Sequence, residues 1–212
     1  MGAGWLPWSA ASLASGAVLL VLGALSMPPT TEVGQVIDAV AHQDAAWLMA
    51  TASFFLASVG LTMGLPAILW LFPRRHQVVG LVGLWIWAVG TIGTAGVASL
   101  LVLFRAVART VDLTPEQVEA LSRDPLLRLG LGAVVVAFHL GELVVALVLL
   151  RGRAAPVWVP AMLLLHVALA PVNHLLPANL QSVQAIVLGV GLMGIAVRAT
   201  ESWAGSRPLA RL

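Results

Sequence analysis

Long apolar stretches dominate the pattern of hydrophobic and polar positions along the 212 residues. A helix needs about 20 largely apolar residues to cross the hydrocarbon core of a bilayer. The runs are continuously apolar and do not alternate with polar residues, so we predict helices rather than the strands of a membrane barrel. The predicted spans cover residues 9–27, 46–72, 78–104, 128–150, 156–176 and 180–199.

Two of the polar connections between these spans also carry helix signals. From Val33 to Val40, apolar residues recur at helical spacing opposite polar ones, which is typical of a helix lying on a membrane surface. Thr114 to Gln117 have the pattern of a capping box, and Asp124-Pro125 predicts the end of that helix. We therefore expect an all-α polytopic membrane protein, a six-transmembrane-helix bundle with two short extracytoplasmic helices.

Composition supports a membrane location and excludes several function classes. The chain is 60% hydrophobic and 9% charged, whereas a soluble domain is typically about 25% charged. It has no cysteine, which excludes disulfides, thiolate metal sites and cysteine nucleophiles. Its basic residues are all arginine and do not form the clustered face that nucleic acid requires, so we expect no nucleic-acid partner. The Ala-, Leu-, Val- and Gly-rich composition is typical of a GC-rich bacterial genome.

Arginine placement predicts the orientation in the bacterial cytoplasmic membrane. The apolar run 10–25 has no basic residue before it, so we interpret it as the first span and not as a cleaved signal peptide. With the N-terminus inside, seven arginines fall in inner segments and four in outer ones, in accord with the positive-inside rule. We therefore place both termini in the cytoplasm, with a single domain over 1–200 and a cytoplasmic tail over 201–212.

Glu142 is the only acidic residue inside any predicted span. A charged group at the centre of a membrane helix costs roughly 2.5–3.5 kcal/mol on insertion scales, so its default interpretation is a functional site. His139 lies one helical turn before it, close to the midplane, and His166 reaches a similar depth on the next span. The short connection 151–155 makes these two spans antiparallel neighbours, so the two histidines can face one another.

Several interpretations of this cluster remain open. His139 and His166 could ligate a b-type haem, or both histidines and Glu142 could hold a metal ion. The cluster could instead anchor a small hydrophobic or lipid-like ligand, or merely fasten helices together through polar bonds. We take ligand binding as the leading function and assign no metal. A membrane cytochrome or metal-dependent membrane enzyme, and an accessory subunit of a larger membrane complex, are the alternatives.

Further polar and aromatic residues extend the candidate site. Pro171 should kink the fifth span, and Asn173 shares a helical face with His166. His174, Asn179, Gln181 and Gln184 follow, as a water-filled vestibule or as a polar cap at the interface. Trp85 and Trp87 lie deep in the third span, as a cavity wall or as plain packing. The candidate ligand-binding residues are therefore His139, Glu142, His166, Asn173, His174, Trp85 and Trp87.

Glycines in the spans indicate close helix packing. Gly60 and Gly64 form a small-xxx-small pair, for which we favour packing inside the bundle over a homodimer. Gly90, Gly93 and Gly96 line the third span, and Gly189, Gly191 and Gly194 the sixth.

Part of the chain is similar to known sequences. The residues concerned are Ala137-Phe138-His139-Leu140, the run Leu149-Leu150-Arg151-Gly152-Arg153 and the ending Leu175-Leu176-Pro177. Over 130–198 the layout resembles a group of uncharacterised six-span bacterial integral membrane proteins, a domain of unknown function. The resemblance implies an architecture and no activity.

Overall fold

The computed structural model describes residues 4–30, 33–177 and 180–206, and every regular element in these residues is a helix. Two of the elements, η1 and η2, are 3₁₀ helices. In chain order the elements are α1 (Leu6–Ser26), α2 (Val33–His42), α3 (Asp44–Trp70), η1 (Arg74–His76), α4 (Gln77–Thr110), α5 (Pro115–Ser122), α6 (Pro125–Gly152), α7 (Trp158–Leu169), η2 (Ala170–Leu175) and α8 (Val183–Gly205). The predicted all-α class is therefore confirmed.

Five helices are long and apolar enough to cross a membrane, namely α1, α3, α4, α6 and α8. Their outward apolar side chains form a lipid-facing surface, so the chain is a polytopic membrane protein. The predicted span 156–176 contains a shorter apolar helix, Trp158–Asn173. It is shorter because the α-helix changes to a 3₁₀ helix at Ala170, next to Pro171, which lacks a backbone N–H.

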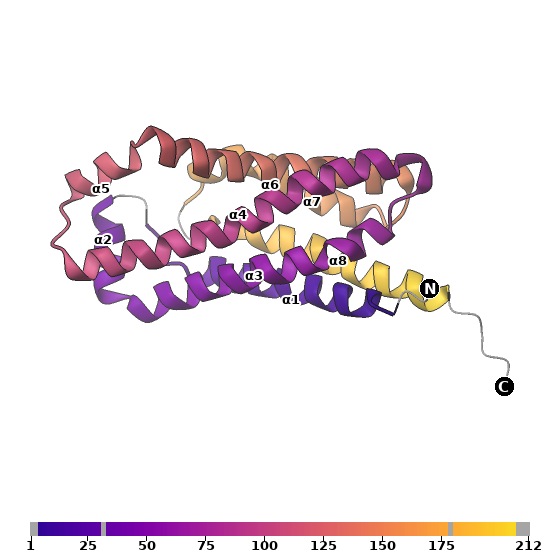
Figure 1. Cartoon of the computed structure of the whole chain (residues 1–212), viewed down its shortest axis with the longest axis horizontal. Coiled ribbons are helices and arrows are strands. Elements are labelled where there is room, and N and C mark those ends of the chain that lie inside the picture. Colours follow the sequence, from indigo (N-terminus) through magenta and orange to yellow (C-terminus); the bar gives the residue numbers. More distant parts are fainter. Residues whose placement is uncertain (1–3, 31–32, 178–179, 207–212) are drawn as a thin grey trace.

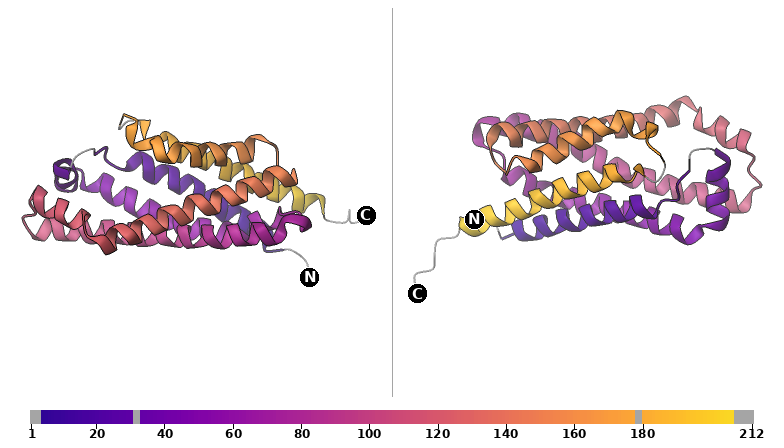
Figure 2. Two further views of the ribbon diagram at one scale, coloured as in Figure 1. Left: turned by 90° about the horizontal axis from the view of Figure 1, so that it is seen from above. Right: turned by 180° about the vertical axis from the view of Figure 1, so that it is seen from behind.

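The long helices and α7 form a closed ring. Going around it, α1 packs on α3, α3 on α4, α4 on α6, α6 on α7, α7 on α8, and α8 returns to α1. The predicted neighbours on either side of the short connection 151–155, α6 and α7, are confirmed. α3 and α4, which are joined through the short η1, are neighbours as well. The start of α1 and the end of α8 lie at one end of the ring, and α2 and α5 lie at the other (Figures 1 and 2).

The predicted glycine contacts form inside the bundle. A methyl group at Gly60 would lie 2.9 Å from Cα of Gly16 on α1, and one at Gly64 would lie 2.6 Å from Cβ of Leu13. The face of α3 that carries this pair is therefore covered by α1, which rules out a homodimer through Gly60 and Gly64. The glycines predicted in α8 are likewise covered, by residues of α1 and α7.

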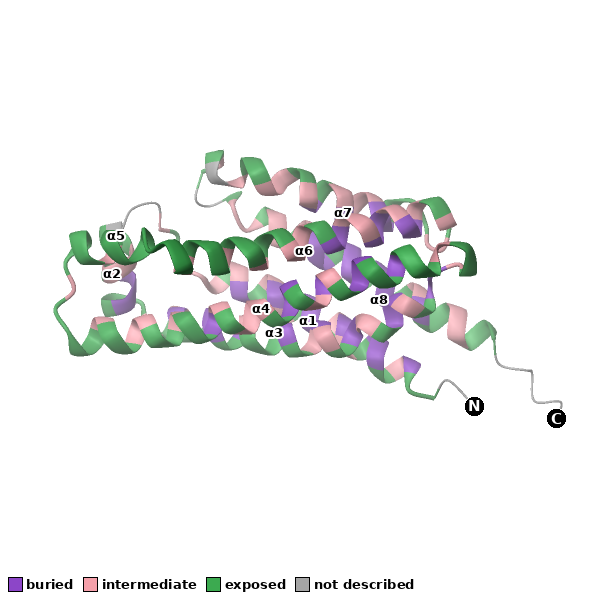
Figure 3. Ribbon diagram, turned by 45° about the horizontal axis from the view of Figure 1, so that its top comes forward, coloured by how far each residue is buried: buried purple, intermediate pink, exposed green. Residues whose placement is uncertain are grey.

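Glycines also determine how α4 and α6 meet. A methyl group at Gly90 would lie 2.4 Å from Cα of Phe138, and one at Gly93 would lie 2.5 Å from the Val134 side chain. Beyond this point Gly96 has nothing within 4 Å, in contrast to the prediction that it packs. The two helices separate there toward α5 (Figure 1). The buried residues concentrate in the other half of the bundle, toward the termini (Figure 3).

A serine of α1 compensates for a proline inside α3. The Ser9 hydroxyl donates to the backbone oxygen of Met63 at 2.9 Å and accepts from the backbone nitrogen of Ala67 at 3.0 Å. Pro66 lies inside the helix between them, and a proline frees helical polar groups that a neighbour must satisfy in lipid. Ser9 therefore joins α1 to α3 at this proline.

The capping interactions predicted from the sequence form at the end of the bundle that carries α2 and α5. Thr114 and Gln117 form the reciprocal capping box, and the Asp124 side chain accepts from the backbone of Leu127 at 2.9 Å. The predicted surface helix exists as α2, with the Ala39 and Val40 side chains buried, while Glu32 before it lies outside the described residues. The carboxylate of Asp44 bonds to two arginines of α4, Arg105 and Arg109.

Candidate functional site

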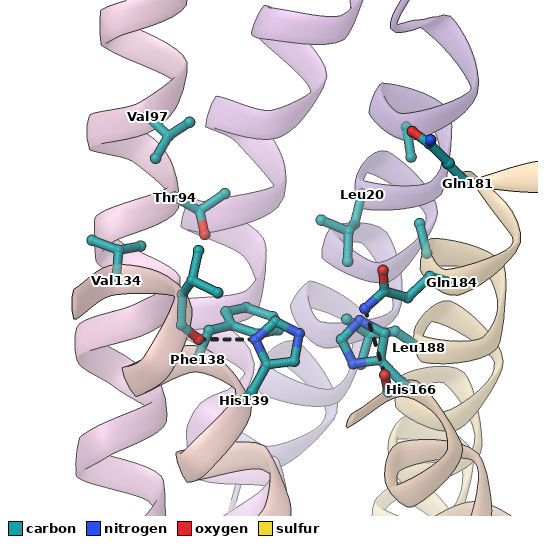
Figure 4. A pocket seen from close by; sticks show the side chains of 13 residues that line it. Leu20, Thr94, Val97, Val134, Phe138, His139, His166, Gln181, Gln184 and Leu188 are labelled. Carbon is teal, nitrogen blue, oxygen red and sulfur yellow. Dashed lines mark hydrogen bonds between the residues drawn. The ribbon is translucent and has the colours of Figure 1, made fainter. Parts of the chain in front are cut away.

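A cavity of about 350 Å³ lies between five helices of the ring, α1, α4, α6, α7 and α8. Its walls are mostly apolar, and its polar side chains gather on the α7 and α8 side and at the end formed by two imidazoles (Figure 4). We call that end the floor. The cavity is lined by Leu20, Ala24, Thr94, Val97, Val134, Val135, Phe138, His139, His166, Gln181, Gln184, Ala185 and Leu188.

His166 connects the cavity to a buried carboxyl group. Its Nδ1 lies 2.7 Å from Oε2 of Glu142 on the neighbouring helix α6. Glu142 is 0% exposed and His166 is 5% exposed, and Glu142 does not itself line the cavity. A contact of this length between nitrogen and oxygen requires a proton between the two atoms. The carboxyl therefore stands behind the imidazole and leaves Nε2 as the ring nitrogen that Glu142 does not use.

His139 lies beside His166 on the floor. The two rings stack with centroids 5.1 Å apart and an angle of 11° between their planes. Nδ1 of His139 lies 2.8 Å from the backbone oxygen of Val135, one turn back on the same helix. Phe138 meets both imidazoles edge-on. The predicted meeting of His139, Glu142 and His166 is thus seen in the structure, with His166 in the middle.

Polar atoms on this floor and beside it have no partner among the described residues. Nε2 of His139 and Oε1 of Glu142 are both enclosed and without a hydrogen bond, and so is Nε1 of Trp87 on α4. Such atoms are uncommon in folded proteins because each costs roughly 1–3 kcal/mol to bury unpaired. A further such atom is Oδ1 of Asn173, and among the residues that carry these atoms only His139 lines the cavity.

Two glutamines mark the side of the cavity toward α2 and α5. Nε2 of Gln184 donates to the backbone oxygen of His166 at 3.5 Å, and Nε2 of Gln181 donates to the backbone oxygen of Leu176 at 3.2 Å. A second cavity of about 480 Å³ lies beyond them, under the segment that follows α1, and shares Ala24 and Gln181 with the first. The two hollows therefore share two lining residues, and the vestibule stays a prediction.

Other predicted site residues lie elsewhere. Trp85 is 69% exposed and does not line the cavity. It points away from the bundle because two residues two positions apart on a helix, here Trp85 and Trp87, differ by about 200° in direction. Trp87 is 1% exposed and packs edge-on against Phe138 behind the cavity wall. Asn173 is not among the lining residues, because the 3₁₀ turn rotates it away from the α-helical face of His166. The side chain of His174 and all of Asn179 lie outside the described residues.

The geometry tests the cofactor alternatives. Two axial histidines of a haem point one nitrogen each at the iron from opposite faces of the macrocycle. Here the rings are stacked face to face with centroids 5.1 Å apart, so the two Nε2 atoms do not point at a common iron from opposite sides. The pair therefore does not fit a b-type haem held between the two histidines. Among the described residues, no three histidine, aspartate or glutamate side chains are arranged to hold a metal ion.

Sequence reasoning missed the apolar walls of the cavity. Leu20 and Ala24 of α1, and Thr94 and Val97 of α4, line it although nothing distinguishes them from lipid-facing residues in an apolar span. The sequence signal that could have located the cavity on the sixth predicted span was the pair of glutamines near its start, Gln181 and Gln184.

Comparison with protein families, curated proteins and solved structures found no match to this chain. The site must therefore be interpreted from its own chemistry.

Proposed function

We propose that this membrane protein binds a small hydrophobic or lipid-like ligand in the cavity above His139, Glu142 and His166. The observation that carries the proposal is a buried carboxyl–imidazole pair whose imidazole lines a hollow with mostly apolar walls. Ligand pockets typically have volumes of roughly 300–1,000 Å³, with apolar walls and a few polar groups that orient the ligand. The cavity has these properties at the small end of the range.

The unpaired atoms favour a ligand site over a purely structural role. A pair that only fastened α6 to α7 would be complete once His166 met Glu142. Instead, an imidazole nitrogen of His139 and a carboxyl oxygen of Glu142 remain without described partners. Because His139 lines the cavity and Glu142 does not, a polar head of a bound molecule is one way to satisfy the His139 nitrogen.

We propose further that the chain crosses the bacterial inner membrane six times with both termini cytoplasmic, as the resemblance to six-span proteins suggests. The 12 residues of α7 and the 6 residues of η2 together extend about 30 Å, which equals a typical hydrocarbon thickness. The start of α1 and the end of α8 also lie at one end of the ring, as an even number of crossings requires (Figure 1).

Mass spectrometry of lipids and other small molecules that co-purify with the protein tests the ligand proposal. The variant Ala185→Phe places a ring in the cavity, because Ala185 lines it. Trp85→Phe is the matched control, since Trp85 is exposed and away from the cavity. We expect a species that purifies with the wild type and with Trp85→Phe and is depleted from Ala185→Phe. The same profile in all three proteins would refute a ligand in this cavity.

The carboxyl behind His166 favours a second candidate, an enzyme that uses this imidazole as a general base. A carboxyl group that orients an imidazole is a common arrangement for proton transfer to or from a bound molecule. In that case the co-purified species should change in mass when it is incubated with the wild type and remain unchanged with Glu142→Gln. An unchanged species in both proteins leaves binding as the only role.

A further inference from the structure

His139 has a defined hydrogen-bonding role on the cavity floor. Its Nδ1 lies 2.8 Å from the backbone oxygen of Val135, and a carbonyl oxygen only accepts hydrogen bonds, so Nδ1 carries the proton. In the neutral ring Nε2 is then an acceptor. That nitrogen is enclosed and has no partner among the described residues. His139 therefore lacks a hydrogen-bond donor.

The neighbouring ring does not supply this donor. His166 stacks on His139 with nearly parallel planes, and its Nδ1 is engaged by Glu142. If Glu142 provides the proton of that contact, Nε2 of His166 carries a hydrogen and can donate to a ligand. If His166 provides it, its Nε2 is a second acceptor. In either arrangement the acceptor of His139 stays unpaired, and because this nitrogen is enclosed, a donor from a bound molecule reaches it only when the side chains around it shift.

The cavity walls limit the charge of that molecule. No arginine, lysine, aspartate or glutamate lines the cavity among the described residues, so neither an anionic nor a cationic head would find a counter-charge there. A charged head without a partner is strongly disfavoured in such surroundings. An uncharged hydroxyl is a compact group that can donate to one acceptor and accept from a donor at the same time.

We infer that the ligand is a neutral amphiphile whose head is a hydroxyl group, an alcohol or a phenol, donating to Nε2 of His139. This inference rests on the proposed function and narrows its ligand class. The apolar body of the ligand lies between the α4 and α6 walls on one side and Leu20 and Leu188 on the other (Figure 4). Esters and ethers of the same size lack the donor and bind less tightly.

Two probes that differ only in the donor test the inference. The probes are 4-octylphenol and its methyl ether, titrated calorimetrically into the protein in lipid nanodiscs, with empty nanodiscs measuring partition into lipid alone. After correction for partition, we expect the phenol to bind about tenfold more tightly or better. A ligand that leaves a buried acceptor unpaired loses roughly this factor in affinity. Sites that hydrogen-bond a hydroxyl often discriminate more strongly.

Variants assign the preference to the named nitrogen. His139→Phe removes the acceptor and keeps a ring in the stack, so the ratio of the two affinities should fall to about one while the ether binds as before. Trp85→Phe should keep the wild-type ratio. A loss of folding would weaken both probes equally, so the ratio separates recognition from a structural effect.

The outcomes distinguish this inference from the proposed function. Equal, saturable binding of both probes to the wild type, lost in Ala185→Phe, would overturn the hydroxyl inference and leave the cavity as a ligand site. A phenol preference that survives in His139→Phe would also overturn it. Absence of saturable binding for both probes would refute both proposals.

Discussion

Nδ1 of His166 lies 2.7 Å from Oε2 of Glu142, and this contact joins α6 to α7 within the bundle. Both side chains are buried. The pair therefore links two adjacent helices of the ring and also directs one imidazole into the cavity.

We expect this pair to stabilise the fold. Glu142→Ala and His166→Ala should each lower the free energy of unfolding by at least about 1 kcal/mol, and a double-mutant cycle should give a coupling energy of about 1–2 kcal/mol. Interhelical polar bonds in membranes contribute roughly 0.6–2 kcal/mol. Reversible unfolding in mixed micelles measures all four corners of the cycle. A coupling energy of zero would mean that the two side chains do not interact.

The contact between α4 and α6 should tolerate no added methyl group at Gly141. A Cβ there would lie 2.3 Å from the backbone nitrogen of Trp87, so Gly141→Ala must push the helices apart, at a cost of about 1–3 kcal/mol. Gly132→Ala on the same helix is the matched control because nothing lies within 4 Å of its Cβ. Thermal unfolding in detergent compares the two, and equal melting temperatures would contradict the packing described for Gly141.

Ser9 should matter only because of Pro66. Ser9→Ala leaves the backbone oxygen of Met63 and the backbone nitrogen of Ala67 without their bridging hydroxyl, and we expect a loss of about 1–3 kcal/mol. In a Pro66→Ala background these two groups can pair directly as in a regular helix, so the same change should cost much less. Unfolding measurements on the four proteins test this, and equal losses in both backgrounds would show that Ser9 acts independently of Pro66.

Single cysteines can count the membrane crossings, because the chain has no cysteine of its own. A membrane-impermeant maleimide added to intact cells should label Gln117→Cys in α5 and Leu175→Cys in η2. It should label Ser206→Cys, next to the C-terminal end of α8, only after the membrane is opened. Labelling of Ser206→Cys together with Gln117→Cys in intact cells would mean an odd number of crossings.

Much of the helical framework was predictable because lipid leaves few alternatives for a long apolar segment. The capping box at Thr114 and the glycine pair in α3 are local signals whose physical meaning does not depend on distant residues. The switch to a 3₁₀ helix at Ala170 was harder to predict. Pro171 indicates a disturbance but not whether the helix bends or tightens, and the resulting rotation moved Asn173 away from the cavity.

The site was predictable at its polar floor and not at its walls. A carboxyl and two imidazoles at membrane depth are conspicuous because each is costly there. Trp85 and Trp87 lie at almost the same depth, and only one of two residues so spaced can face inward. The sequence contains no signal for which one it is, because aromatic side chains are accepted both by lipid and by a helix interface.

The last close glycine contact between α4 and α6, at Gly93 and Val134, lies next to the cavity residues Thr94 and Val97. Because the helices diverge from this point, a small change in their crossing angle alters the width of the hollow more than it alters the contact itself. If the proposed ligand occupies the hollow, the crossing angle set at Gly93 therefore limits how bulky that ligand can be.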